Sequence, residues 1–321
     1  MTTPEWKGLF EWSMKYHDGT RPSEMSAQDV DPEKMKWLDN VLKNYMTDFN
    51  DRMKEITQVF EDGENSDASI AEKVALLDEL QDIVESVDHA KNLHTIGGLS
   101  TLITILECPH AILRQKAAEV VSTCVQNNLP VQQWFRESGV LPPLMKLLTD
   151  ENDMCRLRGW LAISSLIRNY PEGEKIFLSA GGSRLLLEAA SSQNDKIRRR
   201  ALSLMQYVLR GESRKSVLDS GGVEIAMGAL DSGNSEVRQA ALGALIEAAE
   251  DRDGNVKVRQ AGGLLEKTTQ IHKRLSDLPN NEKEMFLEEM EAAEKLIESL
   301  HQPSSSRSSQ QQQKCTALSL A

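Results

Sequence analysis

The fold is decided by a stretch that reads Ser220-Gly221-Gly222-Val223 and continues, after a short apolar segment, as Val237-Arg238-Gln239-Ala240-Ala241-Leu242-Gly243-Ala244-Leu245-Ile246. In the second part, the apolar residues at 237, 241, 244, 245 and 248 follow the i, i+3/i+4 spacing of an amphipathic helix. Glycine adopts positive φ readily, so it ends a helix and turns the chain. The stretch therefore predicts a short helix that ends at the glycine pair, a second helix after it, and a long third helix.

The same pattern recurs along the chain. Small-residue turns have their first glycines at 97, 139, 181, 221 and 262, in steps of 42, 42, 40 and 41 residues. A second marker keeps the same period, because Arg114, Arg156, Arg198 and Arg238 are spaced by 42, 42 and 40 residues. A period of about 40–47 residues with only helical patterning is typical of armadillo and HEAT units. We therefore predict an all-α, armadillo-like right-handed solenoid of about four three-helix repeats of 40–42 residues. A non-repetitive helical bundle is the alternative, but it does not account for two markers in phase.

The chain divides by composition into four regions. The array is predicted to begin near Ser69, which forms a capping box with Glu72. The C-terminal residues are rich in Ser and Gln and cannot bury a core, so we expect them to be disordered. The predicted regions are an N-terminal helical module at 1–66 that ends in an acidic linker, the repeat array at 67–275, an acidic capping helix at 276–301, and the tail at 302–321.

The N-terminal module is unusually rich in methionine. Six of the twelve methionines lie within the first 53 residues, and a second helix is predicted to start at Asp31-Pro32 with an apolar stripe that runs from Met35 to Phe60. Met is an adaptable side chain that is over-used on promiscuous apolar surfaces. Two interpretations stay open: the module binds a partner, or its side chains dock the helices on the first repeat.

The composition excludes several classes of protein. Lys and Arg number 37 and Asp and Glu 49, so the net charge is −12, and we expect neither a nucleic-acid nor a membrane partner for the protein as a whole. No run approaches about 18 consecutive apolar residues, which argues against a transmembrane helix. The start has no signal-peptide pattern. The four cysteines form no CxxC pair, which argues against a disulfide scaffold or a zinc site and favours the cytoplasm.

No motif in the chain points to catalysis. P-loop, zinc-protease, nucleophile-elbow and dinucleotide-binding strings are absent from the sequence. Asp251–Asn255 resembles the start of a calcium loop, but Val256 stands where the loop needs Gly and Gly262 where it needs Glu. The six histidines lack metal-ligand spacing. We therefore predict that the chain is not an enzyme, has no metal or cofactor, and acts through the concave surface of a solenoid.

Third helices line the concave surface in armadillo folds, and the period places their side chains in rows. Nuclear import receptors carry repeated Trp in the second row and Asn in the third, and neither ladder is present here, which weakens a nuclear-import function. The first row instead aligns three basic residues, which either contact an acidic patch on a folded partner or form salt bridges with neighbouring acids. The rows are Lys116, Arg158, Arg200 and Ala240; Glu119, Leu161, Ser203 and Gly243; and Thr123, Ser165, Tyr207 and Glu247.

Four strings of the sequence carry a family resemblance: Leu9–Met14 with Asp18-Gly19-Thr20, then Glu85–Leu93, Ser122–Asn128 and Ala162–Asn169. They resemble motifs of the armadillo-type nucleotide exchange factors of the seventy-kilodalton heat-shock chaperone, the heat-shock-binding-protein family. The segment Glu85–Leu93 is similar to that family's Glu-Asn-Leu-Asp-Asn-Ala-Asn-Asn string. The resemblance covers about residues 6–275.

The resemblance implies a mechanism and a partner. The curved array would grip one lobe of the chaperone's ATPase domain and displace the other lobe, so that ADP escapes, while the exchange factor itself binds no nucleotide. Ala90 and Arg200 would lie on the gripping face. Together with the row positions, the predicted chaperone-binding residues are Ala90, Lys116, Arg158, Arg200 and Tyr207.

The resemblance also implies a role in client release for the N-terminal part, which in this family is proposed to compete with chaperone clients. The lumenal branch of the family carries a signal peptide and a retention motif; both are missing here, which favours the cytoplasmic branch, and we expect a monomer. His89 and Lys91 depart from the family pattern, in which Asn is common. The candidates for client mimicry are Trp6, Phe10, Met35, Met46 and Met53.

A generic armadillo scaffold is the alternative function, for example an adaptor for ubiquitin ligases. The two functions differ in their response to nucleotide. An exchange factor would recover the chaperone from a lysate and release it when ATP is added, whereas a scaffold would hold its partner regardless of ATP.

Overall fold

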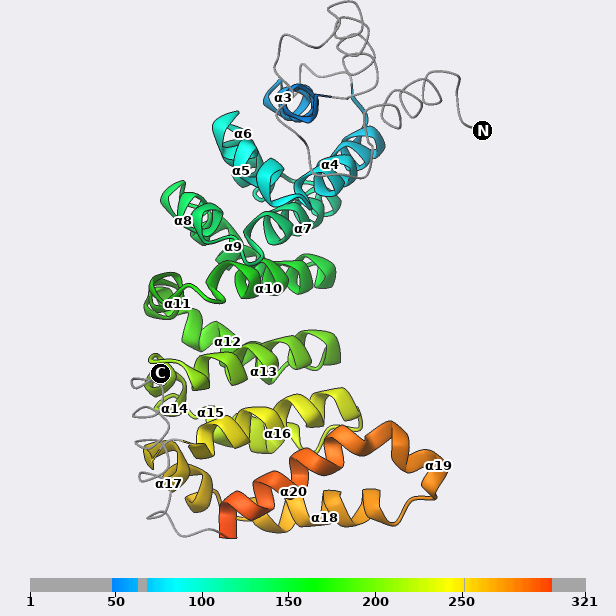
Figure 1. Ribbon diagram of the computed structural model, residues 1–321, viewed down its shortest axis with the longest axis vertical. Coiled ribbons are helices and arrows are strands. Elements are labelled where there is room, and N and C mark those ends of the chain that lie inside the picture. The colour runs from blue at the N-terminus through cyan, green and yellow to red at the C-terminus, as the bar shows by residue number, and fades with distance from the viewer. Residues whose placement is uncertain (1–47, 63–67, 251, 302–321) are drawn as a thin grey trace, which may run out of the picture.

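The computed structural model describes residues 48–62, 68–250 and 252–301, and the predicted helices before residue 48 and the Ser/Gln tail lie outside these ranges. Within them every element is a helix, and the helices stack into one elongated column (Figure 1). Long helices lie side by side along the column, and shorter helices connect them. The prediction of an all-α, armadillo-like array of three-helix repeats is confirmed.

Four complete repeats form the middle of the column. Each has a first helix, a second helix after the glycine turn, and a third helix, as the sequence pattern predicts. In the third of these repeats the turn spans Leu178–Gly182 and kinks at Gly181. The helices are α5 (Val87–Thr95), α6 (Gly98–Ile105) and α7 (Ala111–Val125); α8 (Leu129–Glu137), α9 (Leu141–Leu147) and α10 (Asp153–Ile167); α11 (Pro171–Phe177), α12 (Ser183–Ala190) and α13 (Asp195–Arg210); and α14 (Arg214–Leu218), α15 (Gly222–Ala229) and α16 (Ser235–Glu250).

The glycine turns separate first from second helices by a left-handed residue. Gly97, Gly139, Gly181 and Gly221 have φ values of 84°, 83°, 98° and 87°, a conformation that costs glycine little because it has no Cβ. In the fifth turn the left-handed residue is Gly263, with φ of 81°. In this turn the left-handed residue is therefore the second glycine of the pair, whereas the repeat period was counted from the first glycine, Gly262.

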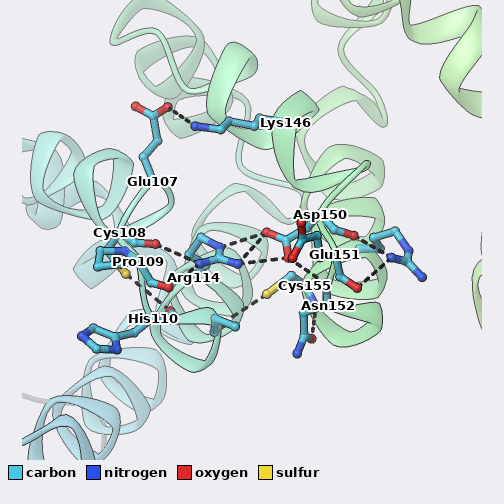
Figure 2. A network of polar contacts seen from close by, with 12 residues as sticks. Glu107, Cys108, Pro109, His110, Arg114, Lys146, Asp150, Glu151, Asn152 and Cys155 are labelled. Atoms are coloured by element: carbon cyan, nitrogen blue, oxygen red, sulfur yellow. Dashed lines mark hydrogen bonds and ion pairs between the residues drawn. The ribbon is translucent and has the colours of Figure 1, made fainter.

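The periodic arginines hold the loop that precedes each third helix. Arg114 Nη1 donates to the carbonyl oxygens of Cys108 and Pro109, both at 2.9 Å, and its Nε and Nη2 donate to the Asp150 carboxylate of the next repeat at 2.9 and 3.0 Å (Figure 2). Arg238 Nη1 donates in the same way to the carbonyl oxygen of Ser232 at 2.8 Å. The second marker is therefore structural: it keeps the third helices in register.

The N-terminal end of the column is closed by α3 (Phe49–Glu61) and α4 (Ile70–Val84). The helix α3 packs against α4, α5 and α6, and its Met53 and Ile56 are fully buried. This part of the predicted N-terminal module is thus continuous with the array core. The capping box of Ser69 and Glu72 is present at the start of α4, as predicted.

The predicted apolar stripe from Met35 to Phe60 does not continue as one helix through residue 48. Asp48 is extended, with φ −73° and ψ 96°, and its carboxylate accepts hydrogen bonds from the N–H groups of Asn50 and Asp51 at 2.9 and 3.4 Å. An N-cap aspartate begins a helix because it satisfies N–H groups that have no partner inside the helix. The described helix therefore starts at Phe49.

The C-terminal end is a fifth helix triplet, and the predicted capping helix forms its last part. The predicted capping helix is divided into α19 (Asn280–Lys283), a 3₁₀ turn at Glu284–Phe286 and α20 (Leu287–His301). The last of these packs on α16 and on α18 (Leu264–Ser276), in the place that a third helix occupies in the other repeats (Figure 1). The first helix of this triplet is α17 (Arg252–Gln260).

A single apolar core runs along the column from Met53 in α3 to Leu296 in α20, and among these helices only the short α19 contributes no buried residue to it. Because each repeat shares this core with its neighbours, the rows of third-helix side chains are held on one continuous scaffold. Among the described helices, none has the length and apolar character that crossing a bilayer requires.

Candidate functional site

The candidate site is the surface formed by the outward-facing rows of α7, α10, α13 and α16, which we name the third-helix surface. These helices pack directly on one another in chain order. Asparagine N-caps fix where two of them start: Asn152 accepts from the N–H groups of Met154 and Cys155, and Asn194 from those of Lys196 and Ile197. The caps and the periodic arginines together set the register of the rows.

Two of the three aligned basic residues are paired within the protein. Lys116 Nζ lies 2.7 Å from a carboxylate oxygen of Asp78 and 3.2 Å from one of Glu119. The hydrogen bond from Lys116 to Asp78 is the main cause that raises the pKa of Lys116. Arg158 Nε lies 2.5 Å from a carboxylate oxygen of Glu119, which is itself buried. In the free protein, Lys116 and Arg158 therefore form salt bridges with neighbouring acids, which is one of the two alternatives that the sequence left open.

Arg200 differs from its row neighbours. It is half-buried on α13, and no carboxylate pairs with it within the described residues. Its Nε is buried without a hydrogen-bond partner. Burial, together with the nearby cations Arg199, Arg158 and Arg168, lowers the pKa of the Arg200 guanidinium. A buried cation among other cations is a site that favours an incoming anion.

Tyr207 links α13 to the end of α10. Its hydroxyl oxygen accepts a hydrogen bond from the backbone N–H of Asn169 at 2.8 Å, and the Arg168 guanidinium carbon lies 4.9 Å from the ring centroid. A guanidinium over an aromatic face is attracted by the ring quadrupole. Tyr207 and Arg168 therefore form one rigid unit beside Arg200, and the unit adds a second cation to this part of the surface.

The remaining row positions are mostly occupied by contacts between repeats. Ser122 and Ser165 share a hydrogen bond of 2.9 Å between their hydroxyl oxygens, and Glu247 pairs with Arg210 at 2.6 Å. At Gly243 the side chain of Gln206 fills the space, and an added Cβ would come within 2.8 Å of Gln206 Oε1. The glycine in the second row thus permits close packing of α16 on α13.

Ala90 lies in the core rather than on an exposed surface. It is 1% exposed on α5, and it lines a recess of about 530 Å³ with Val84, Val87 and Asn128 among the other walls. A partner therefore contacts the rim of this recess before it reaches Ala90. The neighbouring departures from the family pattern have local partners: His89 Nδ1 lies 3.2 Å from the carbonyl oxygen of Ile83, and Lys91 pairs with Asp88 at 3.5 Å.

The candidates for client mimicry fall largely outside the described residues. Trp6, Phe10, Met35 and Met46 belong to residues 1–47. Met53 is described, and it is fully buried in α3. With α3 in place, Met53 contacts the array core and presents no surface to a client.

The calcium-like string forms the start of a helix. Residues from Arg252 onward are helical in α17, and Asn255 is buried with its Nδ2 donating to the carbonyl oxygen of Ala249 at 3.0 Å. Across the part of the chain that the structure describes, no group of three or more His, Cys, Asp or Glu side chains is arranged to hold a metal ion.

One further row escaped the sequence analysis. Arg168 lies one helical turn beyond Ser165, and Arg210 follows it by 42 residues, at the same position of the next third helix. The repeat period could have revealed both arginines from the sequence. Adding 42 residues to Gln126 gives Arg168, and adding 42 more gives Arg210. Arg168 places a cation beside Arg200, whereas Arg210 is engaged by Glu247.

Two family models match adjacent parts of the chain. Residues 89–219 match the family model described as SIL1/FES1/HPBP1 C-terminal domain, and residues 6–93 match the model described as Nucleotide exchange factor Fes1. The two matches overlap at residues 89–93, and together they include Ala90 and Arg200.

Among curated relatives, the Hsp70 nucleotide exchange factor FES1 of Eremothecium gossypii is 27% identical over 206 residues, which cover 63% of this chain and 69% of the relative. The human Hsp70-binding protein 1 is 29% identical over 232 residues, 71% of this chain and 64% of the relative. Nucleotide exchange factor SIL1 of Xenopus laevis is 32% identical over 152 residues, 47% of this chain and 32% of the relative. The chain thus spans about two thirds of the length of the first two relatives.

Solved structures similar to the chain share its fold. A designed armadillo repeat protein, YIII(Dq)4CqI, aligns with a TM-score of 0.63 at 20% sequence identity, covering 78% of this chain and all of that one. An engineered protein, target OR366, aligns with a TM-score of 0.65 at 20% identity over 80% of this chain and 99% of that one. At this level of identity the likeness concerns the armadillo architecture alone.

Proposed function

The chain belongs to the family of Hsp70 nucleotide exchange factors that the two matched models describe, and from this premise we propose that it binds the ATPase domain of Hsp70 through the third-helix surface and promotes release of ADP. The observation that carries the proposal is Arg200, a half-buried cation whose neighbours are other cations. Such a residue is costly in the free protein and gains most from an acidic partner.

The mechanism follows from rigidity and differential binding. A packed array that shares one core from α3 to α20 bends little, so it binds well only to the lobe arrangement that fits its surface. A ligand shifts a conformational equilibrium by as much as its affinities for the two states differ. Binding to an opened ATPase domain therefore weakens the hold on ADP, and the exchange factor needs neither a nucleotide site nor a catalytic group.

The test is a nucleotide-release assay. The purified full chain should accelerate the release of a fluorescent ADP from the isolated Hsp70 ATPase domain, and the same preparation without Hsp70 should hydrolyse no ATP. An unchanged release rate at saturating protein would overturn the proposal. A scaffold, the alternative function, would bind Hsp70 without changing that rate.

We also propose a cytosolic site of action and a contribution of residues 1–47 to client release. Buried free thiols support the first, because Cys124 and Cys155 are fully covered, and desolvation by burial raises the pKa of the Cys124 thiol. The methionine-rich composition of residues 1–47 supports the second, because Met side chains adapt to many apolar grooves.

A further inference from the structure

An apolar row lies at the edge of the third-helix surface and has no role in the core. Ile70, Ile112 and Met154 are 37%, 40% and 39% exposed. They follow one another at intervals of 42 and 42 residues, on α4, α7 and α10. Single exposed apolar residues are normal on a protein surface. Three in phase on adjacent helices are a stripe, and we name them the apolar edge row.

The apolar edge row is continuous with the basic row. Ile112 precedes Lys116 by four residues, and Met154 precedes Arg158 by four. Side chains at i and i+4 lie on the same face of a helix, one above the other. A partner that contacts Lys116 and Arg158 on this surface therefore also reaches Ile112 and Met154.

The apolar edge row ends after α10, because charged residues replace the apolar ones in the next repeats. The equivalent positions of the next two third helices are Lys196 and Glu236, both exposed and charged. The apolar stripe is thus confined to α4, α7 and α10, and it runs beside the basic row on α7 and α10. Packed helices lie about 8–10 Å apart, so its three side chains span roughly 16–20 Å.

We infer that the apolar edge row is the apolar half of the contact with the Hsp70 ATPase domain, an inference that rests on the proposed function. The surface that it fits on the chaperone is an apolar stripe of about 16–20 Å bordered by acidic side chains. The acidic border faces Arg200, since Lys116 and Arg158 already pair with Asp78 and Glu119, and the apolar stripe covers Ile112 and Met154. Charge complementarity then fixes orientation while apolar burial adds affinity.

The experiment replaces two residues of the apolar edge row with aspartate, at positions where the substitution should not disturb the fold. Ile112 and Met154 are the second residues of α7 and α10, and aspartate in the first turn of a helix is favourable. The double variant I112D/M154D should therefore melt like the wild type. Its matched control is L265D, because Leu265 is also 40% exposed and also the second residue of its helix, α18, which is a second helix.

Affinity for the purified Hsp70 ATPase domain is measured by calorimetry for the full-length wild type and both variants. The double variant should bind at least about tenfold more weakly, because an apolar contact is lost and two carboxylates face an acidic surface. The control should bind like the wild type. An unchanged affinity of the double variant, with a wild type that binds and releases ADP, would overturn this inference alone.

Two other outcomes are distinguishable. A wild type that neither binds the ATPase domain nor releases ADP would remove the proposed function, and this inference with it. Light scattering on the same samples tests the remaining occupant, a second copy of the chain. A wild-type dimer that the double variant converts to a monomer, with unchanged Hsp70 affinity, would assign the row to self-association and overturn the inference.

Discussion

Two arginines on neighbouring third helices illustrate opposite uses of a buried charge. Arg238 is 5% exposed, and its Nε and Nη2 donate to the two carboxylate oxygens of Glu289 at 2.5 and 2.8 Å. Arg200 is half-buried beside Arg158, Arg168 and Arg199. Taking a cation out of water costs several kcal/mol unless it is paired. Arg238 therefore belongs to the scaffold, whereas Arg200 destabilises the free chain at a point where a partner can compensate it.

The first prediction concerns Arg200. Arg200→Gln should leave the melting temperature unchanged or raise it, because the substitution removes a desolvated cation from among other cations. It should also weaken binding to the Hsp70 ATPase domain by about 2–5 kcal/mol, the range for truncating one member of a desolvated interfacial pair. Thermal unfolding and calorimetric titration measure the two effects.

The control is Arg184→Gln, since the Arg184 side chain is 80% exposed on α12, and exposed pairs contribute only about 0.2–1 kcal/mol. A variant at Arg200 that loses stability and keeps its affinity would show that Arg200 is a structural residue.

The second prediction concerns the buried pair of Arg238 and Glu289. Glu289→Ala should destabilise the protein by about 3–5 kcal/mol, because it leaves Arg238 buried without its carboxylate. Glu289 also accepts from the Ser235 hydroxyl, so the substitution removes two contacts between α16 and α20. Urea unfolding measures the loss.

The matched control is Glu107→Ala. The pair of Glu107 and Lys146 is 3.6 Å apart, and both side chains are more than half exposed (Figure 2), so its loss should cost at most about 1 kcal/mol. A double variant Arg238→Met/Glu289→Leu should recover much of the stability, because similar volumes replace both charges. Equal small effects of Glu289→Ala and Glu107→Ala would contradict the structural role.

At the scale of elements, the two ends of the array are built alike. An array exposes the apolar face of its last repeat unless an atypical repeat covers it. The helix α3 covers α4, α5 and α6 with Met53 and Ile56, and its Glu61 accepts from the Thr101 hydroxyl at 2.9 Å. At the other end, α20 takes the place of a third helix, and exposed acidic side chains cover its outer face. Both ends are therefore necessary parts of the fold.

The third prediction compares two truncations. Deletion of residues 1–47 should leave the melting temperature within a few degrees of wild type, because α3 stays in place. Deletion of residues 1–66 removes Met53 and Ile56, both fully buried, and should lower it by more than about 6 °C, since roughly 1 kcal/mol shifts a domain of this size by about 2–4 °C.

A measurement of client release on both truncations tests whether residues 1–47 have a role separate from the structural role of α3. If residues 1–47 compete with clients, both truncations should slow the displacement of a bound client peptide from Hsp70 while the shorter one keeps full ADP release. Normal displacement by the shorter truncation would discard the competition and leave α3 with its structural role.

At the scale of the whole molecule, the proposed function is a coupling between two binding equilibria. The array carries a basic row at its middle, whereas the whole chain has a net charge of −12, so its proposed interaction with an acidic surface would depend on local geometry and not on bulk charge. Its single core makes the repeats act as one body. Under the proposed function, such a body would discriminate between lobe arrangements of the chaperone, and that discrimination would lower the affinity for ADP.

The fourth prediction is the reciprocal effect. If the chain weakens ADP binding to the Hsp70 ATPase domain by some factor, ADP must weaken binding of the chain by the same factor. We expect a factor of about 5–150, the usual range of allosteric coupling. Titrations of the chain into the ATPase domain with and without saturating ADP measure it. An identical Kd in both titrations would identify a scaffold that binds without coupling.

The repeat architecture could be determined from the sequence alone. The positions of the glycine turns, the three helices of each unit and the capping box at Ser69 are all local features. They depend on backbone sterics at glycine, on the spacing of apolar residues along one helix, and on side-chain bonds to N–H groups a few residues away. Resemblance in short strings then identified the family, because such strings can be read from neighbouring residues without knowing the tertiary structure.

The pairing of charges was decided only by the tertiary structure. Lys116, Arg158 and Arg200 are equivalent in the repeat pattern, yet Asp78 and Glu119 neutralise the first two and leave Arg200 among cations. Likewise, Glu289 pairs with Arg238 across 51 residues, and Met53 is buried by helices that follow it. Periodicity places side chains on a face but does not say what approaches that face. The approach of distant segments determines burial and partners, and these decide which charged residue is paired within the fold and which is not.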